Sequence, residues 1–142
     1  MSEEDTVELN VVYNVLFTEY YIYYEMISSY IPCWTDIQFS PSSLIIINSD
    51  EELEQHFTCS DTYPPIDFSN HTLLMASGSI FMHVYHITEK LRKTGENEYN
   101  FDINARLGWY QSPTLWGAAI LIPKLSPNAT VLLNVNVYEI PF

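Results

Sequence analysis

The fold is decided by residues 80–109, which read IFMHVYHITEKLRKTGENEYNFDINARLGW. Apolar and polar residues alternate on both sides of the polar segment KTGENE, and a period of two places successive side chains on opposite faces of a strand. In the second half, the apolar side consists of Tyr99, Phe101, Ile103, Ala105 and Leu107. Gly95 can adopt the left-handed backbone that a tight turn needs. The stretch therefore predicts two antiparallel strands joined in a hairpin.

Further strands are predicted on the N-terminal side of this hairpin. Residues 6–17 (TVELNVVYNVLF) keep a steady period of two and predict one long strand. Residues 19–34 (EYYIYYEMISSYIPCW) fit both strand and helix spacing, and their tyrosines favour strand or irregular structure. Residues 44–48 (LIIIN) form a short apolar run that is typical of a strand buried on both faces.

Three more strands are predicted around and after the hairpin. They cover residues 71–77 (HTLLMAS), 115–124 (LWGAAILIPK) and 130–140 (TVLLNVNVYEI), and the last places Asn134 and Asn136 opposite its apolar residues. The segment LSPNA between the last two strands predicts a second hairpin turn. Sequential antiparallel strands with polar turns indicate a β-rich sandwich.

One short helix is predicted at about residues 50–57. Ser49 is followed three residues later by Glu52, which is the spacing of a capping box, in which each side chain satisfies a free backbone N–H at the helix start. Asp50 and Glu51 add negative charge at the positive end of the helix dipole. The acidic residues are therefore interpreted as the start of a helix and not as a calcium site, because the sequence lacks the glycine-containing loop pattern of a calcium site.

Chain length and composition predict a single domain over residues 1–142. The chain is 47% hydrophobic and 15% aromatic, so it can bury a core that offsets the entropy of folding. The expected fold class is α+β, mostly β, as an antiparallel β-sandwich or partly open barrel with one short helix. Residues 1–5 (MSEED) are expected to be a flexible acidic leader.

The charge of the chain is strongly negative and unevenly distributed. There are 18 acidic residues and five basic residues, giving a net charge of -13, and every basic residue lies at or after Lys90. A negative field repels phosphate groups, since nucleic-acid binding relies on lysine and arginine. DNA, RNA and anionic membrane surfaces are therefore not expected as partners, and the acidity is interpreted as a solubilising surface.

No membrane span and no export signal are predicted. The sequence contains no run of about 20 apolar residues, and its start lacks a positive region followed by an apolar one. Two explanations fit: a cytoplasmic protein, or an exported protein whose signal has been removed. Cys33 and Cys59 are compatible with one disulfide in an oxidising compartment but do not require it.

The motifs predict no catalytic residue, no metal site and no cofactor. His83 and His86 lie three residues apart inside a predicted strand, which puts them on opposite faces and prevents a shared metal ion. The segment MASGSI (residues 75–80) lacks the first glycine and the strand-to-helix turn of a nucleophile elbow. Neither cysteine belongs to a CxxC pair. The chain is therefore expected to be non-enzymatic.

The candidate binding residues are Trp109, Tyr110 and Trp116, which flank Pro113 in the segment GWYQSPTLWG. Pro113 indicates a loop between two strands, where a rigid scaffold can hold aromatic side chains that need not fill the core. Exposed aromatic rings on such a scaffold can stack against sugars or against apolar residues of a partner. The alternative is that these rings pack in the core.

An ordered set of motifs over residues 44–138 resembles a known class of proteins. It consists of LIIINSDEELEQHF, then PPIDFSNHTLLMASG, then paired strands and AAILIPKLSPNATVLLNV. In the second motif, Asp67 can bond the following backbone N–H groups, and Phe68 can anchor the turn to the core. The order resembles small exported lipoproteins of Bacteroidales with unassigned function and, more distantly, the C-terminal domain of protease complex subunit PrcB proteins. Where the latter have a Gly-Gly-Tyr segment, this chain has SGSIFMHVYHI.

The resemblance implies a cell-envelope protein, either an outer-membrane lipoprotein or a periplasmic protein, with a lipid anchor in the full-length form. The expected function is a non-enzymatic β-rich module that contacts another envelope protein or a glycan. Two alternatives stay open. One is an enzyme, such as a hydrolase, whose site is assembled from scattered residues, and the other is a cytoplasmic structural subunit.

Overall fold

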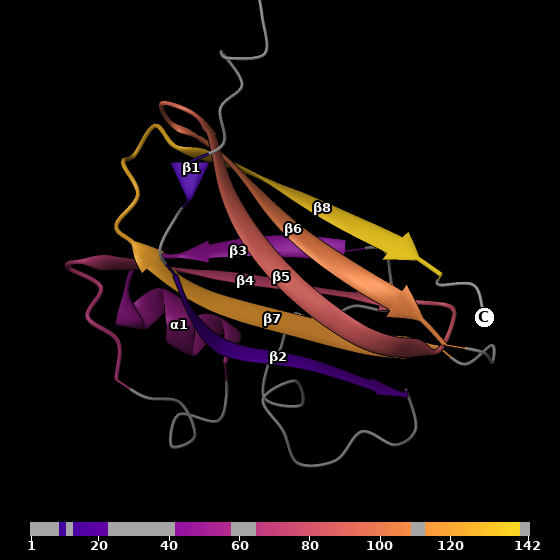
Figure 1. The fold of residues 1–142 in the computed structure, drawn as a ribbon. Helices are drawn as coiled ribbons and strands as arrows, with labels where there is room; N and C mark the ends of the chain where they lie inside the picture. Colours follow the sequence, from indigo (N-terminus) through magenta and orange to yellow (C-terminus); the bar gives the residue numbers. More distant parts are fainter. Residues whose placement is uncertain (1–8, 11–12, 23–41, 58–64, 109–112, 140–142) are drawn as a thin grey trace, which may run out of the picture.

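The computed structural model describes residues 9–10, 13–22, 42–57, 65–108 and 113–139. These residues form two β-sheets and one short helix, so the predicted mostly-β fold class is confirmed (Figure 1). In chain order the elements are β1 (Leu9–Asn10), β2 (Asn14–Ile22), β3 (Ser42–Ile47), α1 (Asp50–His56), β4 (His71–Ile80), β5 (Val84–Gly95), β6 (Glu98–Leu107), β7 (Thr114–Pro123) and β8 (Thr130–Tyr138).

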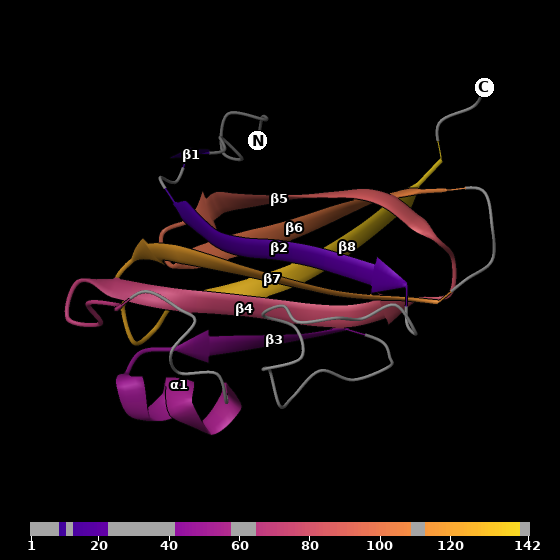
Figure 2. The same ribbon diagram turned by 90° about the horizontal axis from the view of Figure 1, so that it is seen from below.

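The two sheets pack face to face as an open sandwich rather than a closed barrel. Sheet I has the strand order β1-β5-β6-β8, and sheet II has the order β2-β7-β4-β3. Figure 2 shows α1 beside sheet II, on the side away from β5 and β6. At one side of the sandwich β2 meets β5, where the Tyr13 hydroxyl donates to the Glu89 carbonyl at 3.1 Å and the Thr18 hydroxyl donates to the Glu89 carboxylate at 2.6 Å.

Hydrophobic side chains form two layers, one on each face of sheet II. The inner layer lies between the sheets, and its buried members include Leu74, Phe101, Ile103, Trp116 and Ile120. The outer layer packs sheet II against α1, and its buried members include Leu53, Phe57, Phe68, Leu73 and Met75. Leu73 and Leu74 are adjacent and both fully buried. Because sheet II is covered on both faces, its central strands are continuously apolar instead of alternating.

The start of α1 has the capping box that the sequence predicted. The backbone N–H of Glu52 donates to the Ser49 hydroxyl at 3.1 Å. The return contact differs from the prediction, because the Glu52 carboxylate accepts from the backbone N–H of Asn48 at 2.8 Å instead of from that of Ser49. Leu53 and Phe57 then hold the helix against sheet II.

Ser49→Ala is expected to lower the free energy of unfolding by about 1 kcal/mol, because it removes the acceptor for the Glu52 N–H. Urea denaturation followed by circular dichroism measures the change. Asp50→Ala, which removes an exposed charge from the same turn, serves as the control and is expected to cost less than about 0.5 kcal/mol. An unchanged denaturation midpoint for Ser49→Ala would contradict the stabilising role of the cap.

The turn before β4 has the hydrogen bonds that the sequence predicted for Asp67. Its carboxylate accepts from the Ser69 hydroxyl at 2.5 Å, from the Asn70 side-chain amide at 2.7 Å and from the Ser69 backbone N–H at 3.1 Å. These contacts favour the charged form and lower the pKa of Asp67. Their contribution to stability is therefore present above the ordinary carboxyl pKa and is lost as the pH falls through the lower pKa of the folded state. Phe68 is buried in the outer layer and anchors the turn.

The predicted long strand over residues 6–17 is wrong, because the described residues form strands in two different sheets. β1 pairs with β5 in sheet I, whereas β2 pairs with β7 in sheet II. The strand interpretation of residues 19–34 is confirmed as far as Ile22, and the remainder of that segment lies outside the described residues. The alternation expected over this stretch is also interrupted in β2, where a bulge lies between Val15 and Phe17, so that Val15 is 47% exposed and Phe17 is buried in the outer layer.

β8 does not have the antiparallel arrangement that was expected. It pairs with β6 in parallel, from Glu98 opposite Thr130 to Arg106 opposite Tyr138, whereas the other strand pairs among the described residues are antiparallel. Since β7 and β8 belong to different sheets, LSPNA is a connection between the sheets and not a hairpin turn. A short polar segment with a proline fits either connection, so local composition cannot distinguish them.

Two further strands differ from their predicted description. The strand expected over residues 80–93 begins at Val84, because β4 continues to Ile80 and residues 81–82 form a bend. The strand at residues 44–48 was expected to be buried on both faces, but most of β3 is half-buried. Among the described strands β3 pairs only with β4, and this edge position explains its exposure.

Candidate functional site

Of the three predicted binding residues, the structure describes only Trp116. Trp116 is fully buried in the inner core layer, so this side chain packs in the core and presents no surface to a partner. Trp109 and Tyr110 lie outside the described residues, as do Cys33 and Cys59 of the predicted disulfide. These four assignments stay predictions.

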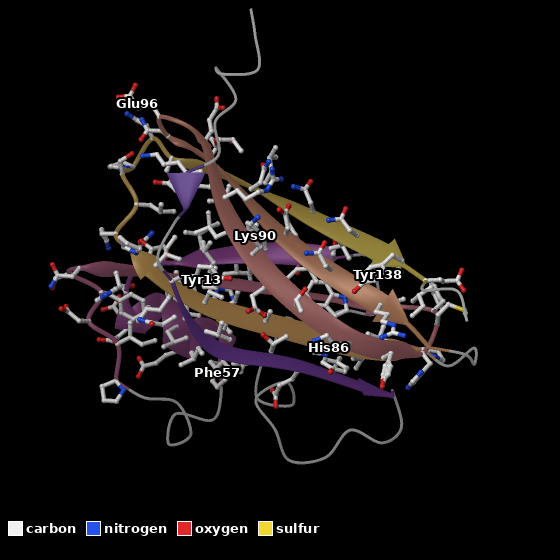
Figure 3. All side chains as sticks on the ribbon, in the orientation of Figure 1. Tyr13, Phe57, His86, Lys90, Glu96 and Tyr138 are labelled. Carbon is white, nitrogen blue, oxygen red and sulfur yellow. The ribbon has the colours of Figure 1, made fainter. Side chains whose placement is uncertain are left out.

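The outward surface of sheet I carries a dense set of polar side chains. Its strands bury one set of alternate residues, among them Leu91, Phe101 and Ile103, and point the other set away from the core. The outward set on β5, β6 and β8, called the outer face below, consists of Thr88, Lys90, Arg92, Asn100, Asp102, Asn104, Arg106, Leu132, Asn134, Asn136 and Tyr138. Figure 3 labels Lys90 on β5 and Tyr138 on β8.

Asp102 lies at the centre of the outer face, and its carboxylate connects the three strands. Arg92 on β5 contacts both carboxylate oxygens, through Nε at 2.5 Å and through a terminal nitrogen at 3.2 Å. Asn134 on β8 donates through Nδ2 to the same carboxylate at 3.1 Å. The side chains of Arg92 and Asp102 are only 24% and 10% exposed. This bidentate contact is largely shielded from solvent, and it holds the side chains in the middle of the outer face in one arrangement.

Two further asparagines form a separate contact beside this network, toward one end of the face. Asn136 on β8 donates through Nδ2 to Oδ1 of Asn104 on β6 at 3.1 Å. A side-chain amide has two donor hydrogens and an acceptor oxygen with two lone pairs, so each group retains bonding capacity after one contact. Asn104 is half-buried and Asn136 is exposed. The outer face therefore offers solvent a row of oriented donors and acceptors.

One end of the outer face is aromatic. It is the end where β5 begins and where β6 and β8 finish (Figure 1). A bulge in β5 places Tyr85 and His86 opposite Arg106, and the Arg106 guanidinium lies 4.8 Å from the centre of the Tyr85 ring. Tyr138 is the register neighbour of Arg106 on the other side. Tyr85, Arg106 and Tyr138 are called the tyrosine–arginine cluster below, and its two rings are 56% and 42% exposed.

Arg106 of the tyrosine–arginine cluster lies shortly before the predicted aromatic loop in the chain. β6 ends at Leu107, and Trp109 follows after Gly108. The Gly108 N–H donates to the carbonyl of His83 at 2.7 Å, and a side chain at position 108 would overlap the His83 ring. A glycine is therefore required for the chain to leave β6 close to the start of β5.

The two histidines have different surroundings, and their predicted placement in one strand is only partly correct. His83 precedes β5 and was wrongly expected to lie inside the strand. His86 lies in β5, and its Nδ1 is 3.2 Å from the Tyr20 hydroxyl on β2 (Figure 3 labels His86). Within the described ranges, no group of three or more histidine, cysteine, aspartate or glutamate side chains could hold a metal ion.

Positive charge is concentrated on sheet I. Its strands contain four of the five basic residues, namely Lys90, Arg92, Lys93 and Arg106. The helix on the opposite side of the sandwich carries four acidic residues, namely Asp50, Glu51, Glu52 and Glu54. The fifth basic residue, Lys124, donates through Nζ to the Phe68 carbonyl at 2.9 Å. The outer face of sheet I is therefore less negative than the rest of a chain whose net charge is -13.

Sequence reasoning placed Asn134 and Asn136 on the polar side of the last strand but did not identify the outer face as a site. The alternating polar residues Asn100, Asp102 and Asn104 are the signal that could have indicated it. Their neighbours could not be found, because only the parallel pairing of β6 with β8 brings Asn134 beside Asp102.

Comparison of the chain with protein-family models, with curated proteins and with solved structures gives no match. In the part of the chain that the structure describes, no helix is long and apolar enough to cross a membrane. Function is therefore inferred from the geometry of the outer face.

Proposed function

We propose that the protein is a non-enzymatic recognition module of the cell envelope that binds a glycan on the outer face of sheet I. The observation that carries this proposal is the combination of oriented amide groups along β6 and β8 with two exposed tyrosine rings at one end of the same face. A sugar ring presents hydroxyl groups around its edge and apolar C–H groups on its faces. It therefore needs both directional hydrogen bonds and flat apolar surfaces.

The amide groups supply the directional hydrogen bonds in this proposal. Asn104, Asn134 and Asn136 project from neighbouring strands, and the contact with Asp102 fixes the orientation of Asn134. Strands in a sheet are about 4.8 Å apart, and alternate residues along one strand are about 6.7 Å apart. The amides thus form a grid that can meet hydroxyl groups of successive sugar units without rearrangement of the side chains, which limits the entropy lost on binding.

The tyrosine–arginine cluster supplies the flat apolar surfaces. The rings of Tyr85 and Tyr138 can each cover the C–H face of a sugar, and Arg106 between them can donate to hydroxyl or carboxylate groups. The contact with the Tyr85 ring restrains the Arg106 guanidinium before a ligand arrives. A neutral or weakly acidic glycan suits the less negative charge of this face.

An envelope protein is the second candidate partner. Phe81 and Leu132 are 75% and 65% exposed, and apolar side chains of this size favour a protein contact more than a sugar contact. The cell-envelope location and the lipid anchor of the full-length form are proposed from the resemblance to exported lipoproteins. A disulfide between Cys33 and Cys59 would agree with that location.

Tyr85→Ala is expected to weaken glycan binding about 30-fold, corresponding to roughly 2 kcal/mol, because it removes a stacking surface. Isothermal titration calorimetry measures the change for the ligand selected from a panel of glucan, mannan, xylan and chitin oligosaccharides. The substitution is expected to change the free energy of unfolding by no more than about 0.5 kcal/mol, since Tyr85 is 56% exposed.

Val15→Ala provides the matched control for this measurement. Val15 is 47% exposed on β2 of sheet II, away from the outer face, so its truncation is expected to leave the glycan affinity unchanged. Absence of binding to every oligosaccharide in the panel would contradict the proposal. Equal weakening by both substitutions would also contradict it, because the effect would then not depend on the outer face.

A further inference from the structure

Strand β8 lies at an edge of sheet I. Its nine residues pair with β6 in an unbroken register, from Thr130 opposite Glu98 to Tyr138 opposite Arg106. Among the described strands none pairs with the other edge of β8 (Figure 1). The backbone N–H and C=O groups that point away from β6 can therefore accept a further strand.

β8 lacks the features that usually prevent edge strands from pairing. Residues 130–138 (TVLLNVNVY) contain no charged residue and no proline. The pairing with β6 shows no bulge that would twist the edge away. Natural edge strands are commonly protected by lysine, proline or a bulge. A nine-residue strand without any of these is suited to pairing with another strand.

The side of β8 that faces the core is also incompletely covered. Val131, Leu133 and Val135 pack against the inner core layer but are only partly buried, and Val137 is 46% exposed. At the same open side of the sandwich, Leu44 of β3 is partly buried against the same layer. Apolar side chains from an added strand would cover these partly exposed residues, and the burial of apolar surface would stabilise the pairing.

We propose that the partner of β8 is the β8 strand of a second copy of this chain, paired antiparallel about Asn134. In this register all nine residues pair. Val131 lies opposite Val137 of the other copy, Leu133 lies opposite Val135, and Asn134 lies opposite itself. The apolar residues thus meet one another on the core side, and two four-stranded sheets become one continuous eight-stranded sheet with two-fold symmetry.

The charge distribution favours a second copy at this edge. Each copy carries a net charge of -13, so association through most of its surface would be opposed by repulsion. β8 itself is uncharged, and β5 and β6 of the same sheet contain four basic residues against three acidic ones, Glu89, Glu98 and Asp102. This edge of sheet I is therefore a part of the surface where electrostatic repulsion between two copies is weaker than elsewhere.

Val137→Lys tests this pairing, because it places a charge in the interface between the two copies. Sedimentation velocity over a range of concentrations is expected to show the unmodified chain moving toward twice its mass of 16.5 kDa. The Val137→Lys chain is expected to stay at the monomer mass. Val15→Lys is the matched control, because it makes the same chemical change at a valine of nearly equal exposure, 47% against 46%, and it is expected to dimerise like the unmodified chain.

Asn134→Cys tests the register and does not depend on the behaviour of Val137→Lys. Residues directly opposite in an antiparallel pair have Cα atoms about 4.5–5.5 Å apart, within the range that a disulfide bridges. Mild oxidation is expected to link two copies through position 134, which mass spectrometry detects in the tryptic peptide that follows Lys124. Leu132→Cys is the control, since two copies of position 132 would lie about 13 Å apart along the strands.

Three results would overturn the proposal. The first is an unmodified chain that keeps the monomer mass at every concentration. The second is dissociation by Val15→Lys to the same extent as by Val137→Lys. The third is cross-linking of Leu132→Cys as efficient as that of Asn134→Cys, which would exclude the register about Asn134. Glycan affinity is measured separately by calorimetry, so failure of the dimer and failure of the proposed glycan site are distinguishable.

Discussion

Trp116→Ala is expected to lower the free energy of unfolding by about 3–5 kcal/mol, the range for removal of a large buried ring. Trp116 is fully buried on β7, between Tyr20 of β2 and Gly78 of β4, and it faces the inner core layer with Phe101 and Ile103 of sheet I. Its removal would leave a cavity between the two sheets. Urea denaturation followed by circular dichroism measures the loss, because tryptophan fluorescence would itself change with the substitution.

Trp116→Phe is the matched comparison for this prediction. The indole Nε1 is buried and has no hydrogen-bond partner among the described residues, so phenylalanine keeps most of the ring volume and removes an unsatisfied donor. The expected cost is below about 1.5 kcal/mol. A loss of less than about 1 kcal/mol for Trp116→Ala would show that this ring does not fill the core and would return it to the candidate binding residues.

Asp102→Ala is expected to lower the free energy of unfolding by about 2–3 kcal/mol. The substitution removes the carboxylate that receives two contacts from Arg92 and one from Asn134, at a position where the Asp102 side chain is only 10% exposed. It leaves a partly buried positive charge without this counter-charge, and losing one member of such a pair costs more than losing both. Chemical denaturation of the purified variant measures the change.

A double-mutant cycle separates the pair from its surroundings. If Arg92 and Asp102 stabilise the sheet through each other, the variant carrying both Arg92→Ala and Asp102→Ala loses less stability than the sum of the two single variants. Additive losses would indicate that the contact between them is not what stabilises this part of sheet I. The two variants that carry Asp102→Ala are also expected to weaken glycan binding, because Asn134 loses the contact that orients its amide.

The candidate site could be predicted from the sequence only in part. The alternation of Asn100, Asp102 and Asn104 identifies one polar side of a strand, and the same holds for Asn134 and Asn136. Alternation within each strand does not say which strands are neighbours. The site exists because β8 joins β6 in parallel and brings the two polar rows together, and that pairing depends on contacts between residues about 32 positions apart.

The exposure of aromatic side chains also could not be predicted from the motifs in which they occur. Trp116 follows Pro113 closely and was expected at a loop, but β7 begins at Thr114 and carries the ring into the core. Tyr85 and Tyr138, which no motif singled out, are the exposed rings of the tyrosine–arginine cluster at one end of the outer face. A strand that is apolar on both faces has no alternation that would separate inward from outward residues, so neighbouring structure decides the exposure of Trp116.

The sequence by itself determined the features that depend on contacts within a few residues. These are the alternation of β5 and β6, the hairpin between them, the cap at Ser49 and the Asp67 turn, since each is stabilised by hydrogen bonds or by a face of one strand. Only the tertiary structure decided the division of β1 and β2 between sheets, the parallel pairing of β8 and the burial of Trp116. Those outcomes follow from how two sheets share one core. A strand buries the same alternate residues whichever sheet it joins, so its local pattern is equally compatible with several partners, and only the packing of the whole chain selects among them.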